Sequence, residues 1–113
     1  MVIFISQPMS KKSEEEIVAQ RQRAIEKITK KYGHDVEILN TYFNDDYRHS
    51  VEEALGCTLK NKDLFWLSQA LEFLSDADVI WLCDGWEWSK GCLVERKCAE
   101  LYGIPEKFDA DYK

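Results

Sequence analysis

Short apolar runs alternate with longer stretches of helical periodicity along this chain. Val2–Ser6 and Val79–Cys83 are continuous apolar runs that contain β-branched residues, which is typical of buried strands. Val36–Phe43 alternates well enough to predict another strand, and Ile104-Pro105 can begin a short edge strand. Strands that are separated by helices require right-handed crossovers, which produce a mainly parallel sheet. We therefore predict an α/β fold with a mainly parallel sheet of four or five strands.

Three helices are expected to separate and follow these strands. The first begins at a capping box, Ser13 with Glu16, and Gly33 supplies its C-terminal stop. A longer helix from Asn61 carries an apolar face that comprises Leu64, Leu67, Leu71 and Leu74, widened by Phe65, Trp66 and Phe73. The last long helix is predicted over Gly91–Tyr102.

The remaining segments show weaker patterns. Asn44–Ser50 is polar without periodicity and is expected to be a loop, and Val51–Leu55 can form a short helix. The final residues of the chain have the character of a loose tail. With 113 residues, the chain is predicted to be one domain, residues 1–113.

Composition and charge narrow the function classes. The net charge of −6 disfavours binding to a nucleic-acid polymer, which normally requires a basic surface. The initial apolar stretch is too short for a signal or membrane segment, so a soluble cytoplasmic protein without membrane contact is expected. The four cysteines lack C-x-x-C spacing and are best explained as buried free thiols. No metal or cofactor motif is found, and His34 and His49 are expected at the surface.

Two loops carry groups that suit a ligand. Ser6–Ser13 joins a strand to a helix N-terminus, where free amides, hydroxyls and lysines can hold a phosphate or a sugar hydroxyl. Taken alone, this loop is more often an ordinary turn. The second loop, Asp84–Gly91, contains Trp86 and Trp88, which could form a wall against a flat base, cover the end of the sheet or make a dimer contact.

Glu95 follows the second loop and is predicted to lie in the first turn of the last helix. From there its carboxylate would point into a pocket at the C-terminal edge of the sheet, where open α/β folds bind ligands. A carboxylate in the first helical turn also stabilises a helix, so Glu95 alone is more often structural than catalytic.

Three segments in register resemble the nucleoside 2-deoxyribosyltransferase-like superfamily, and most closely its small branch labelled DUF4406. They are Ile3–Ser10, Ser75–Val79 and Gly91–Glu95, which together span nearly the whole chain. The resemblance implies a flavodoxin-like or Rossmann-like three-layer sandwich. It also implies cleavage of the N-glycosidic bond of a nucleoside or nucleotide, by transfer or hydrolysis, through a glutamate nucleophile.

Particular roles follow from the resemblance. Glu95 matches the nucleophile, and Ser89 matches a serine that contacts the 5′-phosphate in monophosphate hydrolases. The implied substrate-binding residues are Ser6, Gln7, Pro8, Met9, Ser10, Asp84, Gly85, Trp86, Ser89 and Gly91. No cofactor or metal is implied, and a homo-oligomer is expected because superfamily members commonly complete their active sites with a neighbouring subunit.

Two positions depart from the family pattern. Phe4 stands where the family has a tyrosine, and Ala70 stands where it has a catalytic aspartate. Asp63, Glu72 and Asp84 are the alternative candidates for the acid, although none occupies the expected position. These departures motivate an alternative hypothesis, a protein of the same fold that binds a nucleotide-like ligand without catalysis. A structural role with Trp86 and Trp88 at an oligomer interface is a third.

Overall fold

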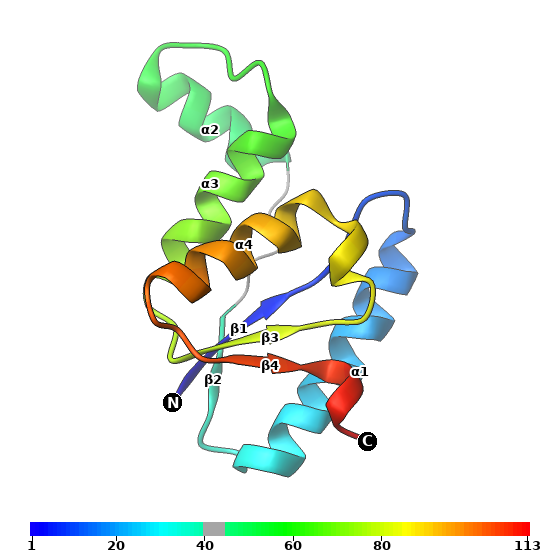
Figure 1. The fold of residues 1–113 in the computed structure, drawn as a ribbon. Coiled ribbons are helices and arrows are strands. Elements are labelled where there is room, and N and C mark those ends of the chain that lie inside the picture. Colours follow the sequence, from blue (N-terminus) through cyan, green and yellow to red (C-terminus); the bar gives the residue numbers. More distant parts are fainter. Residues whose placement is uncertain (40–44) are drawn as a thin grey trace.

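A four-stranded, all-parallel sheet forms the centre of the protein (Figure 1). The computed structural model describes the backbone of residues 1–39 and 45–113 and the side chains of residues 1–39 and 48–113. The strands are β1 (Val2–Ser6), β2 (Glu37–Ile38), β3 (Val79–Leu82) and β4 (Glu106–Phe108), in the spatial order β2-β1-β3-β4. The predicted α/β class and the parallel sheet are thereby confirmed.

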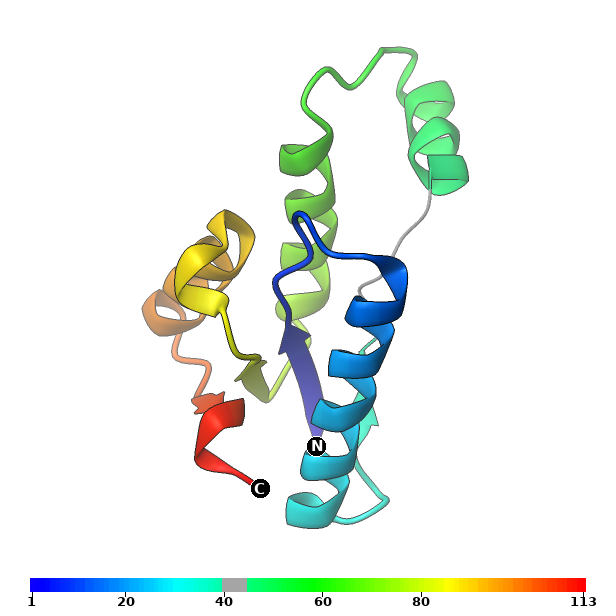
Figure 2. The same cartoon turned by 90° about the vertical axis from the view of Figure 1, so that its right-hand side faces the viewer.

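Helices cover both faces of this sheet, which gives a three-layer arrangement of the flavodoxin-like or Rossmann-like kind (Figures 1 and 2). One face is covered by α1 (Glu14–Tyr32) and the other by α3 (Lys62–Leu74) and α4 (Lys90–Leu101). The helix α2 (Asp45–Leu55) stands at the far end of α3, away from the sheet in both views. Two short 3-10 helices, η1 (Trp86–Trp88) and η2 (Asp109–Asp111), follow β3 and β4.

The alternation of side chains along β1 divides the core in two. Ile3 and Ile5 pack on the α1 face with a buried cluster that also contains Ala24, Ile28, Val79, Trp81 and Cys83. Phe4 points to the opposite face and packs there with Leu39, Ala70, Leu74, Ile80, Leu82 and Ala99. Because successive side chains of a strand face opposite sides, Ser6 lies on the same side as Phe4, towards α4.

The first helix forms as its sequence predicts. The Ser13 hydroxyl accepts from the Glu16 amide at 3.1 Å, and Gly33 ends the helix in the left-handed region at φ 88°. Glu16 reaches back to the hydroxyl of Ser13, at 3.2 Å. The buried residues of α1 are Ile17, Ala24 and Ile28, which share one face at helical spacing, with Ile25 and Tyr32 partly buried beside them.

The expectations for the middle of the chain need three corrections. The helix α2 begins at Asp45 rather than Val51, so the polar residues 45–50 are helical and not a loop. Within the described residues, the second strand is limited to Glu37–Ile38, and residues 40–43 of the predicted strand lie outside them. In α3 the buried residues are Phe65, Ala70 and Leu74, whereas Leu64 is 61% exposed. The predicted face is thus confirmed at Leu74 and Phe65 and wrong at Leu64, and Ala70 completes the buried side of the helix.

The end of the chain is anchored, so the expectation of a loose tail is wrong. The buried Asp109 accepts from the indole N–H of Trp81 at 2.9 Å and pairs with Lys27 at 2.9 Å. The Tyr112 ring stacks on Trp81 with centroids 4.8 Å apart. These contacts join η2 to β3 and α1, which are distant in sequence, so local pattern does not reveal them. Among the described helices, none combines the length and apolar character that a bilayer crossing needs.

Candidate active site

The side chains of Ser6 and Glu95 meet at the carboxyl end of β1. The Ser6 hydroxyl donates a 2.7 Å hydrogen bond to Oε1 of Glu95, and both residues are buried. Ser89 caps α4 by accepting from the Cys92 amide at 3.3 Å, so the helix starts at Lys90. Glu95 is consequently in the second turn of α4, not in the first turn as predicted, and it faces the sheet rather than the free amides of the helix end.

Burial dominates the chemistry of Glu95. Loss of solvent penalises the carboxylate and raises the pKa of Glu95 from 4.5 to about 7, while the hydrogen bond from Ser6 acts in the opposite direction. The side chain is only 8% exposed, and its described surroundings offer no ion pair. A buried carboxylate at the carboxyl edge of a parallel sheet, with its pKa near neutrality, is typical of a functional group.

Cys92 and Lys12 complete the neighbourhood of this carboxylate. Burial raises the pKa of the Cys92 thiol, whereas hydrogen bonds with Ser6 and Ser89 and the positive charge of Lys12 act to lower it. Lys12 thus brings a cation from the first loop close to the start of α4. Sequence reasoning did not single out Cys92 as a member of the site, whereas Lys12 is one of the two first-loop lysines that it considered for holding a phosphate.

An amide chain ties the two loops beside the site together. The amide nitrogen of Gln7 donates to the Ile17 carbonyl at 2.7 Å and to the side-chain oxygen of Gln20 at 3.2 Å. Gln20 in turn donates to the Asp84 carbonyl at 3.1 Å. Next to this link, a Cβ atom on Gly85 would lie 3.4 Å from the Pro8 ring, so the two loops approach closely. Gln20 carries no sequence signal, because it is one polar residue in an amphipathic helix.

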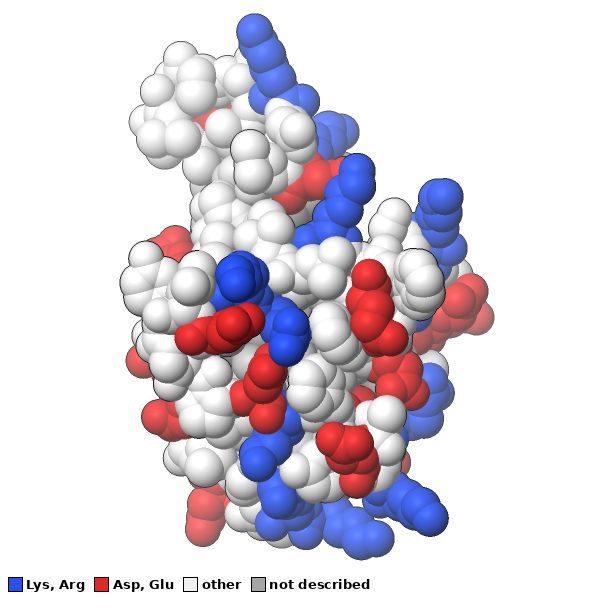
Figure 3. Space-filling view, in the orientation of Figure 1, with Lys and Arg blue, Asp and Glu red and all other residues white. Residues whose placement is uncertain are grey.

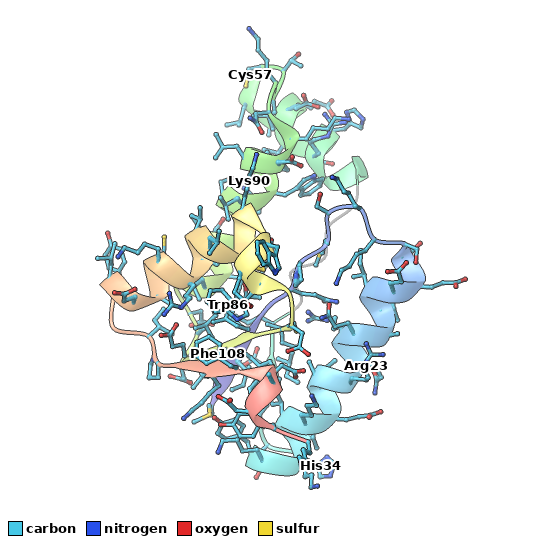
Figure 4. All side chains as sticks on the ribbon, turned by 45° about the vertical axis from the view of Figure 1, so that its right-hand side comes forward. Arg23, His34, Cys57, Trp86, Lys90 and Phe108 are labelled. Atoms are coloured by element: carbon cyan, nitrogen blue, oxygen red, sulfur yellow. The ribbon has the colours of Figure 1, made fainter. Side chains whose placement is uncertain are left out.

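A hollow lies at the carboxyl ends of β3 and β4, one strand away from Ser6. It has a volume of about 450 Å³ and is lined by Leu82, Asp84, Gly85, Trp86, Glu87, Phe108 and Ala110; we call it the β3–β4 hollow. The ring centroids of Trp86 and Phe108 lie 5.4 Å apart, and the two residues come from neighbouring segments of the chain at this edge (Figure 4). Trp88, in contrast, is 89% exposed.

The predicted binding residues are therefore divided between two places. Ser6 and Ser89 lie around Glu95 and Cys92, with Gly91 in the first turn of α4. Asp84, Gly85 and Trp86 line the β3–β4 hollow, which Glu95 does not line. In the first loop, Gln7 and Pro8 are buried, Met9 is half-buried and Ser10 is exposed.

The two departures from the family pattern share one environment. Phe4 and Ala70 are both buried in the apolar cluster between the sheet and α3. Asp63 and Glu72, the acids considered on α3, are exposed to solvent, as is Asp84. None of the three therefore shares the buried surroundings of Glu95.

The cysteines and histidines add no further centre within the described chain. All four cysteines are free, but Cys57 is exposed, so the expectation of four buried thiols holds for Cys83 and Cys92 and is wrong for Cys57. His34 and His49 are exposed, as predicted. A second hollow of about 550 Å³ lies against α2, lined by Arg48, His49, Glu52, Glu53, Gly56, Cys57 and Thr58. Among residues 1–39 and 48–113, no group of three or more potential metal ligands occurs.

Comparison of the chain with protein-family models, with curated proteins and with solved structures returned no match.

Proposed function

We propose that this protein cleaves the N-glycosidic bond of a nucleoside or nucleotide, with Glu95 as the nucleophile. The observation that carries the proposal is the buried Ser6–Glu95 pair, joined at 2.7 Å at the carboxyl end of β1. Its position agrees with the resemblance to the nucleoside 2-deoxyribosyltransferase-like superfamily, in which a glutamate attacks the anomeric carbon.

In this mechanism a carboxylate oxygen of Glu95 bonds to the anomeric carbon as the carbon–nitrogen bond breaks, and the electron pair leaves with the base. Water or a second base then attacks the glycosyl ester and releases Glu95. Ser6 engages Oε1 and orients the carboxylate, and no hydrogen bond from a described residue reaches Oε2. Oε2 is therefore the oxygen that we assign to the attack.

A phosphate on the sugar fits the groups at the start of α4. Ser89, the first amides of α4 and the nearby Lys12 together form a polar, locally positive environment on an acidic protein. We infer that a 5′-phosphorylated substrate binds better than the corresponding nucleoside. A homo-oligomer that completes the site with a neighbouring subunit belongs to the same proposal.

A ligand-binding protein without catalysis is the second candidate. Phe4 and Ala70 favour it, since the hydroxyl and the carboxylate of the family are replaced by apolar side chains in a packed cluster. A base that departs without receiving a proton leaves as an anion and is a poor leaving group, so loss of an acid lowers the rate of the family reaction.

Incubation with deoxynucleosides, ribonucleosides and their monophosphates, followed by chromatography for free base, tests the proposal. We expect release of base by the wild type and its loss in Glu95→Gln, whereas the exposed Glu15→Gln control retains it. Calorimetric binding without release of base would favour the second candidate. Equal release by Glu95→Gln and the wild type would refute the role of Glu95.

A further inference from the structure

We propose that the β3–β4 hollow binds a flat ring that carries a positive charge, such as a pyridinium or another N-alkylated heteroaromatic ring. This site is separate from the Ser6–Glu95 pair, and the proposal does not depend on the reaction assigned to Glu95.

The position and size of the hollow suit a small ligand. It opens where β3 and β4 end, at Leu82 and Phe108, and ligands of open parallel sheets bind at this edge. Its volume of about 450 Å³ lies within the ordinary range for small-molecule sites. A single ring with one substituent is smaller than this volume, so it would fit without displacement of the lining residues.

Two aromatic rings supply the flat surface. The Trp86 and Phe108 ring centroids are 5.4 Å apart, with planes inclined by 39°. The Arg96 guanidinium lies 5.1 Å from the centre of the Trp86 ring, and Glu106 holds Arg96 through two hydrogen bonds of 2.8 and 3.2 Å. Trp86 is thus held in place before a ligand arrives, which lowers the entropy that binding must overcome.

Two carboxylates supply the negative charge. Asp84 and Glu87 both line the hollow, are exposed, and form no ion pair with a described residue. Arg96, which lies over the Trp86 ring, is already paired with Glu106. Figure 3 shows acidic side chains gathered on this face, over the region of η1 and η2.

These features together select a cationic ring over a neutral one. A neutral ring is held only by its contact with Trp86 and Phe108. A cationic ring is also attracted electrostatically to the faces of these two rings and to the carboxylates of Asp84 and Glu87. The aromatic walls distinguish the hollow from a metal site, and the described residues contain no cluster of potential metal ligands.

Amide NMR titration of the isotope-labelled protein with nicotinamide methylated on its ring nitrogen tests this proposal. The matched ligand is meta-toluamide, which has the same shape and no charge. We expect the cation to shift the amides of Asp84–Glu87 and Phe108–Ala110 and to bind about tenfold more tightly than meta-toluamide. Added salt should weaken the binding of the cation and leave that of meta-toluamide unchanged.

Variants separate the charge of the site from its shape. The double variant Asp84→Asn, Glu87→Gln should bind the cation no better than meta-toluamide. The control double variant Glu14→Gln, Glu15→Gln, at exposed positions of α1, should bind both ligands as the wild type does. Trp86→Leu should weaken both ligands, and Phe108→Leu provides the same test if Trp86→Leu does not fold.

Equal affinity for the two ligands, absence of binding by the cation, or shifts confined to other amides would each overturn the proposal. Because the titration measures binding alone and can be repeated in Glu95→Gln, its failure is distinguishable from the failure of the proposed glycosidic reaction.

Discussion

The Ser6 hydroxyl and the Glu95 carboxylate, 89 residues apart in the sequence, share a buried hydrogen bond of 2.7 Å. One comes from the end of the first strand and the other from the second turn of α4, so the bond joins the two segments that border the candidate active site. The hydrogen bond also lowers the pKa of Glu95, whereas burial raises it.

The free energy of unfolding should fall as the pH rises from 4.5 to about 7, because burial raises the pKa of Glu95 from 4.5 to about 7. The folded state holds this proton more tightly than the unfolded state, so the contribution is fully present below pH 4.5 and lost above about pH 7. At about 1.4 kcal/mol per unit, the loss is roughly 3 kcal/mol. Urea unfolding across this range should show the decline in the wild type and in Glu15→Gln, but not in Glu95→Gln. An unchanged decline in Glu95→Gln would assign the effect to other groups.

Removal of the Ser6 hydroxyl should raise the pKa of Glu95 further, because its hydrogen bond favours the ionised carboxylate. An NMR titration of the Glu95 carboxyl carbon in Ser6→Ala measures this change. Ser10→Ala, which removes an exposed hydroxyl in the same loop, should leave the titration where it is in the wild type. A shift in the opposite direction in Ser6→Ala would contradict the role given to the bond.

Loss of the Gln20 amide should loosen the loop after β3, because its bonds to Gln7 and to the Asp84 carbonyl would disappear. We expect faster hydrogen exchange at the Trp86 and Trp88 amides in Gln20→Ala and a stability loss of about 1 kcal/mol. The control Gln22→Ala, two residues away and exposed, should show neither effect. Identical exchange in both variants would argue against the amide chain.

Asp109→Ala should destabilise the protein by roughly 1–3 kcal/mol, since the buried indole N–H of Trp81 loses its acceptor and Lys27 loses its partner. Asp111→Ala, in the same short helix and exposed, should change stability by less than about 0.5 kcal/mol. Urea unfolding of both variants measures the difference, and similar values for the two would show that the anchor is weak.

Adjacent residues of α3 should differ sharply in their response to truncation. Phe65→Ala removes a buried ring and should cost roughly 3–5 kcal/mol. Leu64→Ala removes a side chain that is 61% exposed and should cost less than about 0.5 kcal/mol. The reverse order, measured by urea unfolding, would restore the leucine face that periodicity suggests.

The elements that were predicted correctly are those with a strong local signal. The helix α1 has a capping box, a buried stripe and a terminal glycine, and β1 and β3 are continuous apolar runs. In α3 the signal was only partly informative, because the leucines share one face but Leu74 is buried whereas Leu64 is exposed, and only packing decides which of them are covered. The C-terminal segment has almost no pattern of its own, and its order depends on Trp81 and Lys27.

The sequence motifs located the candidate site but did not identify all of its residues. The sequence pointed to Ser6, Ser89 and Glu95, which lie close to the carboxyl end of the sheet. It did not indicate Gln20 or Cys92, because each is an ordinary helix residue until the fold brings it near. It also grouped Trp86 with Glu95, whereas the two belong to different places at the sheet edge.

The sequence by itself determined the α/β class, the order of strands and helices and the segment that holds Glu95, because periodicity, caps and apolar runs act over a few residues. Only the tertiary structure decided that Glu95 is buried and bonded to Ser6, that its pKa lies near 7, and that Asp109 anchors the chain end. Burial, desolvation and long-range hydrogen bonds depend on residues that meet in space while remaining far apart along the chain.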